Sequence, residues 1–523
     1  MAMDYGLLTM DRYIIHNFLT KDMIMKRLPL LVLLLLLAGL SACEEELDQV
    51  PRSDASAASF FRNAADFEQA VNGVYNSLRG FPDRAYYLSE VRSDNIYGVG
   101  EAGVRDWEPI NNFAVTLATN PLVKEAWDAN FLGVFRANTV LDQLQARPGA
   151  VPEDALRNRL EAEARFLRAF FYFDLVKYFG PVPLIDRVLT PEQVLEVPRS
   201  AVAAVYDLII ADLEFALQHL PATYPAANRG RATSHAARAL LAQVYLSRSG
   251  PTYGIAGPGL ATNDYALALQ LLNEIIASNQ FSLVSPYARI FAYDNENNPE
   301  VIFDVQYRSG GLGIGATYPG TMAPTTYFSA ARIPFAGNLE IIPVSNELLN
   351  AYPAADVRKE ATVHQGFTGV TGVFEPRAFY RKYLNEGGRG QDRFDWPINF
   401  IVLRYTDVLL MKAEAILQGA AGSQEEVDAL VSTVQVRAGL PGMTGVTLGQ
   451  LMEVRRREFA AEGLRWHDLV RSGLVLEKMN AWIPAEDIRN QMRKPIDANQ
   501  IIYPIPQSEM DVKRGLYQQN PGY

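Results

Sequence analysis

Residues 161–184, with the sequence EAEARFLRAFFYFDLVKYFGPVPL, constrain the fold of this chain more than any other segment. Apolar side chains would cover nearly every face of a helix formed here, which is typical of a helix buried on all sides. Because a buried helix needs neighbours around it, the segment predicts a large helical domain. Its charged residues, Arg165, Arg168, Asp174 and Lys177, are expected to form ion pairs or to bond to loop carbonyls. For them and for the charges in residues 454–471, structural clamps are favoured over active-site arginines.

Helix periodicity and helix-end signals continue along most of the chain. The predicted helices cover residues 65–79, 121–144, 152–179, 200–219, 233–247, 264–278, 403–418, 424–437 and 448–462. Thr233 is expected to cap its helix, Ser423 and Glu426 form a predicted capping box, and Gly180-Pro181 ends the helix over 152–179. Short strands are predicted at 301–305 and 341–344. Stretches rich in Gly, Pro and Tyr, at 249–263 and 308–337, are predicted to be long surface loops.

Some of these helices follow each other as pairs. The pairs are 233–247 with 264–278, and 403–418 with 424–437. Small residues inside them, such as Ala236, Ala237 and Ala413, would allow close packing. Such pairs resemble the helical hairpins of tetratricopeptide repeats, with a degenerate and interrupted period.

We therefore predict a mainly α fold of tetratricopeptide-like helix pairs, with long irregular loops and a few short strands. We expect a single domain over residues 61–523. It would have an N-terminal part of about 61–300 and a C-terminal part of about 301–523.

The single cysteine of the chain, Cys43, ends the segment MKRLPLLVLLLLLAGLSAC at residues 25–43. Two basic residues precede an apolar run that is too short to cross a bilayer, which takes about 20 helical residues. Residues 25–42 are therefore predicted to be a secretory signal peptide. Leu40-Ser41-Ala42-Cys43 matches the bacterial lipobox, in which the thiol is alkylated with diacylglycerol and the cysteine becomes the new N-terminus. We expect Cys43 to carry acyl chains that anchor the protein to a membrane.

The residues on either side of this signal lead to two further expectations. Residues 1–24 are expected to be a mis-assigned extension, with Met25 as the start. Residues 43–60 are predicted to be a lipidated acidic linker that opens with Glu44-Glu45-Glu46-Leu47-Asp48. These acidic residues are either part of a solvated linker or an export signal, because they resemble the surface-export signal of Bacteroidetes lipoproteins.

Charge and composition disfavour several classes of function. The net charge of −11 disfavours nucleic-acid binding, and a lone cysteine excludes an internal disulfide and a Cys-based zinc site. HExxH, G-x-S-x-G and P-loop sequences are absent. Residues 98–103 match G-x-G-x-x-G but follow no apolar strand, so a flexible loop is favoured. Residues 294–300 resemble the start of a calcium loop but lack its glycine, so a turn is favoured there. We expect no cofactor and no metal ion.

Several segments resemble the SusD/RagB family of outer-membrane lipoproteins. Residues 163–184 are similar to the hallmark helix of that family. Further matches are RATSHAARALLAQVYL at 231–246, NPEVIFDVQ at 298–306, LRYTDVLLMKAEAI at 403–416, RRREFAAEGLRWHDLVRSG at 455–473, and YPIP at 503–506 before the terminal QNPGY. The matches run in family order, so the resemblance covers the chain from Cys43 to Tyr523.

The resemblance implies tetratricopeptide-like helix pairs that support a looped ligand face. It also implies a partner, a SusC-like TonB-dependent transporter in the outer membrane, over which the protein acts as a lid. We therefore expect a surface-exposed, lipid-anchored protein that binds glycans without catalysis and delivers them to the transporter. Peptide capture by the same scaffold is one alternative, and a lipid-anchored glycoside hydrolase is another.

A glycan-binding face needs flat aromatic rings for the apolar faces of sugars, with polar groups for the hydroxyls. The best cluster contains Tyr86, Tyr87, Asp94, Asn95, Tyr97, Arg105 and Trp107. In the starch-binding members of the resembled family this region contributes to the binding arc, so Trp107 is the favoured platform. Tyr318, near Tyr327 and Phe328, and Trp396 are further candidates. For each aromatic residue the alternative is a loop anchor packed on the helical scaffold.

Overall fold

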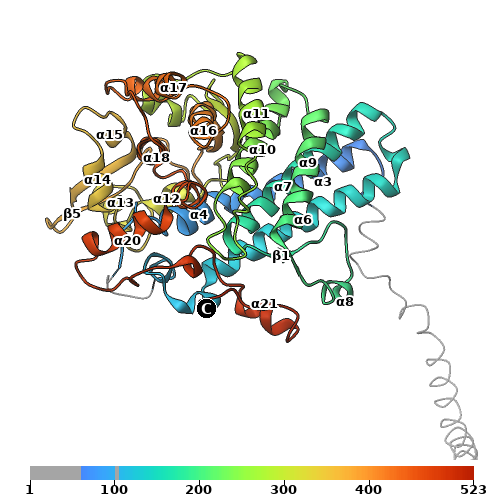
Figure 1. The fold of residues 1–523 in the computed structure, drawn as a ribbon, viewed down its shortest axis with the longest axis horizontal. Coiled ribbons are helices and arrows are strands. Elements are labelled where there is room, and N and C mark those ends of the chain that lie inside the picture. Colours follow the sequence, from blue (N-terminus) through green and yellow to red (C-terminus); the bar gives the residue numbers. More distant parts are fainter. Residues whose placement is uncertain (1–59, 100–104) are drawn as a thin grey trace, which may run out of the picture. The chain divides into compact units, whose positions relative to one another are not determined.

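Helix α7 (Asp154–Phe179) is the buried centre of the helical scaffold in a computed structural model, which describes residues 60–99 and 105–523. It packs against both α6 (Pro121–Ala146) and α9 (Val202–His219), and α3 (Ala64–Tyr75) lies against α6 and α7 (Figure 1). Gly180 ends the helix with a φ of +67°, where a Cβ would lie 2.3 Å from the carbonyl oxygen of Ala256. The predicted buried helix and its stop signal are confirmed.

Residues 63–523 form one compact unit. The predicted extension, signal peptide, lipidation site Cys43 and linker up to residue 59 lie outside the described residues, as do positions 100–103 of the glycine-rich match. The division of the domain into parts of about 61–300 and 301–523 stays a prediction.

Two predicted helix pairs continue the scaffold, and the structure confirms both. Helix α10 (Ser234–Ser249) packs on α11 (Tyr265–Ala277), and α16 (Tyr405–Leu417) packs on α17 (Gln424–Arg437). Helix α11 also contacts α16, so the pairs join into one array (Figure 1). The small residues predicted to allow this packing, Ala236, Ala237 and Ala413, are all completely buried.

Most helix ends agree with the capping signals. Thr233 Oγ1 accepts a hydrogen bond from the N–H of Ala236, and Ser423 Oγ accepts one from the N–H of Glu426. The carboxylate of Glu426 forms an ion pair with Lys412, 2.6 Å away. The cap at Thr233 is confirmed, and at the second helix the Ser423 half of the predicted box is confirmed.

The remaining helices have 12 residues or fewer. They are η1 (Asn76–Gly80), α4 (Phe81–Ala85), η2 (Tyr86–Glu90), α5 (Glu108–Asn111), η3 (Val115–Thr119), η4 (Pro148–Ala150), α8 (Pro191–Val194), η5 (Ala226–Asn228), η6 (Tyr287–Phe291), α12 (Tyr318–Met322), α13 (Thr325–Ala330), α14 (Asn346–Ala351), α15 (Arg358–Thr362), α18 (Leu448–Phe459), α19 (Arg465–Arg471), α20 (Val475–Glu486), η7 (Ala498–Gln500) and α21 (Gln507–Val512). Two of them, α12 and α13, interrupt the stretch predicted as a loop at 308–337.

Three small two-stranded antiparallel sheets complete the described fold. They pair β1 (Val182–Pro183) with β2 (Arg199–Ser200), β3 (Val301–Val305) with β6 (Phe400–Arg404), and β4 (Val363–Thr368) with β5 (Phe374–Tyr380). The strand predicted at 301–305 is confirmed. Leu403 and Arg404, predicted to begin a helix, belong to β6 because they pair with β3. The strand predicted at 341–344 is wrong: Val344 forms only an isolated bridge with Ile96.

Ion pairs hold the apolar helices together, as predicted. Arg168 Nε lies 2.7 Å from Asp212 Oδ2, and Asp174 pairs with Lys177 at 3.5 Å. Three further groups of buried ion pairs, which we together call the ion-pair core, join α18 and α19 to the rest of the fold. Its members are Asp94, Glu300, Asp356, Arg358, Lys382, Arg404, Asp407, Glu414, Arg437, Arg455, Arg456, Glu458, Glu462, Arg465, Asp468 and Arg471. These pairs act as structural clamps.

Candidate ligand-binding site

Two predicted ligand residues, Asp94 and Asn95, lie inside the ion-pair core region. The carboxylate of Asp94 accepts hydrogen bonds from Arg465 Nε at 2.8 Å and Nη2 at 2.7 Å. Burial alone would raise the pKa of Asp94, but Arg456 and Arg465 hold it well below its usual range. Asn95 accepts a bond from Arg456 at 2.8 Å and donates one to Glu90 at 2.8 Å. Their burial favours an anchoring role for both residues over a ligand contact.

Arg105 and Trp107 lie together where the described chain resumes after position 104. The Trp107 ring is only 5% exposed and fills the space beside Gly98, where a Cβ would lie 2.4 Å from Trp107 Cζ3. The guanidinium carbon of Arg105 lies 5.9 Å from the centroid of this ring. Arg105 Nη2 pairs with Glu340 at 3.0 Å, while its buried Nε and Nη1 have no hydrogen-bond partner among the described residues. Two buried donors beside an aromatic ring are suited to bind ligand oxygens.

Tyr97 occupies the edge of a small hollow of about 240 Å³, which Pro343 and Ile488 also line. The N–H of Tyr97 donates to the carbonyl oxygen of Pro343 at 3.1 Å, and its hydroxyl donates to Asp487 Oδ1 at 3.1 Å. Burial, with the charge of Asp487, raises the pKa of Tyr97 to about 12, so the hydroxyl stays protonated. The ring is half-buried, so part of it is open to a ligand.

Tyr318 and Trp396 are both completely buried. The Tyr318 hydroxyl donates to the carbonyl oxygen of Ile398 at 2.9 Å, and the ring packs against Tyr307, Tyr383 and Phe400. Trp396 forms a backbone bridge with Ala316 and packs against Phe328 and Phe335. Neither ring presents a face to solvent. The alternative interpretation, a loop anchor, therefore fits these two residues better than a ligand contact.

Sequence reasoning missed Asp395 and Phe394, which lie directly before Trp396. The Asp395 carboxylate accepts hydrogen bonds from the N–H groups of Gly310 at 3.0 Å, Gly311 at 3.2 Å and Gln391 at 3.2 Å. It thereby fastens the 308–337 segment to the 385–396 loop. Phe394 is 52% exposed, and the guanidinium carbon of Arg393 lies 4.4 Å from its ring centroid. The Gly-rich, polar sequence around Phe394 was the available signal for an exposed aromatic residue.

The segment 337–340 connects this loop with the region around Trp107. Arg393 Nη1 donates a hydrogen bond to the carbonyl oxygen of Gly337 at 3.3 Å, and Glu340 pairs with Arg105 at 3.0 Å. We therefore define the candidate site as Tyr97, Arg105, Trp107, Glu340 and Phe394. Tyr97 and Phe394 supply accessible aromatic surface, Arg105 supplies buried N–H donors, and Glu340 supplies one carboxylate. Trp107 is 5% exposed, so its ring packs beside Arg105 and does not present the open platform that the sequence predicted.

Residues 294–300, which resemble the start of a calcium loop, form a turn. Asp294 pairs with Arg289 at 2.7 Å, and Asn298 Nδ2 donates to the carbonyl oxygens of Ile290 and Asn295 at 2.9 and 3.0 Å. Asn297, with a φ of +52°, reverses the chain ahead of β3. The predicted turn is confirmed. Across residues 60–99 and 105–523, no group of three or more His, Cys, Asp or Glu side chains is arranged to hold a metal ion.

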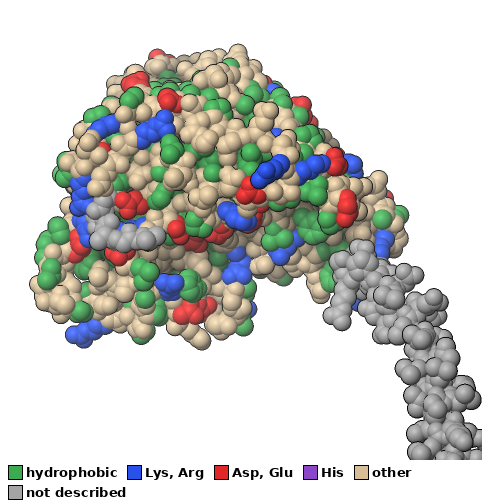
Figure 2. Space-filling view, turned by 90° about the horizontal axis from the view of Figure 1, so that it is seen from below, with side chains coloured by type: hydrophobic (Ala, Val, Ile, Leu, Met, Phe, Trp, Pro, Cys, Tyr) green, Lys and Arg blue, Asp and Glu red, His purple; other side chains and the backbone are tan. Residues whose placement is uncertain are grey.

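Acidic and basic side chains are interspersed over the face of the molecule in Figure 2, with apolar side chains between them. Within the described residues, no helix has both the length and the apolar character needed to cross a membrane.

Two sequence families match this chain. Residues 47–246 match a family described as "Starch-binding associating with outer membrane", and residues 374–523 match the SusD family. SusD-like protein P25 of Formosa agariphila is 24% identical, over 95% of this chain and 100% of that protein. The starch-binding protein SusD of Bacteroides thetaiotaomicron is 25% identical, over 74% of this chain and 76% of that protein.

Solved structures share the fold. A laminarin-binding SusD-like protein is 25% identical with a TM-score of 0.73, over 88% of this chain and 100% of that one. Surface glycan-binding protein A from Bacteroides thetaiotaomicron, solved with laminarihexaose, is 24% identical with a TM-score of 0.74, over 87% of this chain and 99% of that one. This likeness confirms the predicted mainly α fold of tetratricopeptide-like helix pairs.

Proposed function

We propose, from the premise that this chain belongs to the SusD/RagB family, that it captures glycans at the outer membrane for uptake. In this proposal the protein is lipid-anchored at Cys43, binds an oligosaccharide or polysaccharide without cleaving it, and delivers it to a SusC-like TonB-dependent transporter. Relatives named for starch and laminarin binding support the choice of glycan.

The observation that carries the proposal is the environment of Arg105. A guanidinium that is nine-tenths buried keeps two donors without partners in the described structure, beside the Trp107 ring and the half-buried Tyr97. Leaving buried donors unsatisfied costs free energy, and a sugar hydroxyl would satisfy them. Tyr97 and the exposed Phe394 would supply the apolar surface on which a sugar ring stacks.

Replacing Arg105 with glutamine is expected to weaken glycan binding by about 1.5–3 kcal/mol, the size of a charged hydrogen bond, or roughly 10- to 150-fold in Kd. Isothermal titration with laminarihexaose and maltohexaose would measure this, with Arg514→Ala as the matched exposed control. Unchanged affinity in Arg105→Gln would remove Arg105 from the site. Saturable binding of peptides with no binding of either sugar would favour peptide capture instead.

We expect laminarihexaose and maltohexaose to be recovered uncleaved after long incubation with the purified protein, because the proposed function is binding without catalysis. Mass spectrometry of the recovered oligosaccharide would detect cleavage. A shortened product that disappears when a single Asp or Glu is replaced would establish the glycoside hydrolase alternative.

A large barrel protein is expected to co-purify with the native lipoprotein after gentle detergent extraction. The reason is the delivery step: a glycan held at the cell surface reaches the transporter only if the two proteins are in contact. Affinity purification followed by mass spectrometry of the bound proteins would test this. Recovery of the lipoprotein alone, under conditions that keep outer-membrane barrels folded, would contradict the partnership.

A further inference from the structure

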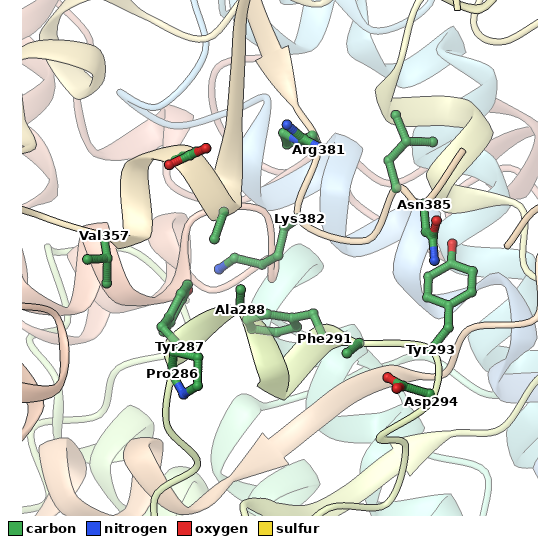
Figure 3. A pocket seen from close by; sticks show the side chains of 14 residues that line it. Pro286, Tyr287, Ala288, Phe291, Tyr293, Asp294, Val357, Arg381, Lys382 and Asn385 are labelled. Atoms are coloured by element: carbon green, nitrogen blue, oxygen red, sulfur yellow. The ribbon is translucent and has the colours of Figure 1, made fainter. Parts of the chain in front are cut away.

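A cavity of about 690 Å³ lies apart from the candidate site, between residues 286–294, residues 357–361 at α15, and residues 381–385 after β5. Figure 3 shows its lining side chains, among them Pro286, Tyr287, Phe291 and Tyr293 opposite Arg381, Lys382 and Asn385. The volume falls in the range of about 300–1,000 Å³ that is typical of small-molecule sites. No member of the candidate site lines it, so it needs its own explanation.

Tyr293 gives this cavity a half-buried aromatic ring in a fixed orientation. Its hydroxyl donates to the carbonyl oxygen of Tyr383 at 2.8 Å. Gly388 packs so closely against the ring that a Cβ at this position would lie only 2.7 Å from Tyr293 Cδ2. Phe291 and Leu384, which are 5% and 8% exposed, extend the apolar lining. An immobile aromatic and aliphatic surface suits the C–H face of a sugar ring.

Polar groups around the apolar lining are left available. The half-buried guanidinium of Arg381 and the exposed carboxylate of Glu360 form no hydrogen bond or ion pair within the described chain. Asn385 Oδ1 accepts from the N–H groups of Gly387 at 3.1 Å and Gly388 at 3.2 Å, which leaves its Nδ2 to donate. Guanidinium and carboxylate groups each offer two parallel hydrogen-bonding positions, which match neighbouring sugar hydroxyls.

The charge balance of the cavity favours a neutral ligand. Lys382 Nζ is committed to the ion-pair core: it donates to Glu462 Oε1 at 2.8 Å and to the carbonyl oxygen of Glu458 at 3.1 Å. Asp294 is paired with Arg289. One free cation, Arg381, and one free anion, Glu360, remain among the described lining residues, so neither a polyanion nor a polycation is favoured.

We propose that this cavity is a second carbohydrate-binding site, which takes a neutral sugar by stacking on Tyr293 and by hydrogen bonds to Arg381, Asn385 and Glu360. The inference rests on the proposed function and extends it to a second site. The segment that carries Asn385 is held in place by α13, because Glu386 accepts a hydrogen bond from the Tyr327 hydroxyl at 2.6 Å.

The test uses the full-length protein with laminarihexaose and maltohexaose as probes. In an Arg105→Gln background, Arg381→Ala is expected to weaken the remaining sugar binding by roughly 3- to 10-fold, the size of a lost hydrogen bond, while Arg514→Ala leaves it unchanged. Tyr293→Phe keeps the ring and should bind more tightly than Tyr293→Ala. Hydrogen exchange should show sugar-dependent protection of residues 286–294 and 381–388, and Arg381→Ala should reduce that protection.

Three results would overturn the second site. Sugar binding that is lost completely in Arg105→Gln, with no protection at 286–294, would leave a single site and the proposed function intact. Protection of this cavity by peptides and not by sugars would assign it to another ligand class. Absence of glycan binding by the wild-type protein would instead refute the proposed function, and with it this extension.

Discussion

Replacing Glu458 with alanine is expected to lower the free energy of unfolding by at least about 3–5 kcal/mol, the cost of breaking a buried ion pair. Its carboxylate lies 2.8 Å from Arg404 Nη1 and 3.1 Å from Arg358 Nη1, and it also pairs with Arg437. All four side chains are at most 4% exposed. The substitution would remove a carboxylate that neutralises part of the charge of three buried guanidinium groups.

Denaturant unfolding followed by tryptophan fluorescence would measure this loss. Glu214→Ala is the matched control, because Glu214 is an exposed residue of α9, and such a surface change is expected to shift stability by less than about 0.5 kcal/mol. Equal stability of the two variants would contradict the structural role of the ion-pair core.

Acid stability should depend on the same carboxylate. Burial alone would raise the pKa of Glu458, but Arg437, Arg404 and Arg358 together hold it well below its usual range. A depressed pKa in the folded state means that the stabilisation is complete above the unfolded pKa, about 4.3, and is lost as the pH falls below it. Glu458→Gln should therefore lose less stability than the wild type between about pH 4 and pH 2. If the free energy of unfolding of both proteins fell in parallel over this pH range, the protonation of Glu458 would not be coupled to unfolding.

Buried ion pairs also explain why the scaffold could be predicted and the ligand contacts could not. Charged residues that recur within nearly apolar helices, such as Arg168 in α7 and Arg455 in α18, need buried partners wherever the chain places them. Their role as clamps therefore followed from sequence. The identity of their partners could not be predicted. Asp212, which accepts from Arg168, and Asp407, which accepts from Arg455, each lie more than 40 positions away along the chain. The segments that resemble the family are largely parts of this scaffold.

Burial of loop aromatics depends on pairing between distant segments, which composition does not reveal. Trp396 is completely buried and Phe394 is 52% exposed, although two positions separate them in one loop. The bridge from Trp396 to Ala316 decides the difference. The same reasoning accounts for Arg404, where pairing with β3 replaced the predicted helix start. Where the periodicity and the end signals of a helix lie within its own sequence, both of its ends could be predicted correctly, as for the helix over 424–437.

Cys43→Ala is expected to abolish attachment to the outer membrane. The apolar run before Cys43 is too short to span a bilayer, so in our interpretation only acyl chains on this cysteine hold the protein there. Two or more chains give stable anchoring, whereas a protein with none has no comparable hold on the membrane. Cell fractionation and labelling with palmitate would follow the loss. Ser41→Ala, which keeps a small residue beside the cleavage site, is the control and should remain lipidated.

The released Cys43→Ala protein should still bind laminarihexaose or maltohexaose with the affinity of the wild type. The reason is distance along the chain: the first long helix of the described fold, α3, begins at Ala64, and the candidate site begins at Tyr97. Titration of the purified soluble variant would separate anchoring from capture. Full membrane attachment of Cys43→Ala would contradict the lipid anchor, whereas loss of sugar binding together with attachment would mean that residues before α3 take part in the binding site.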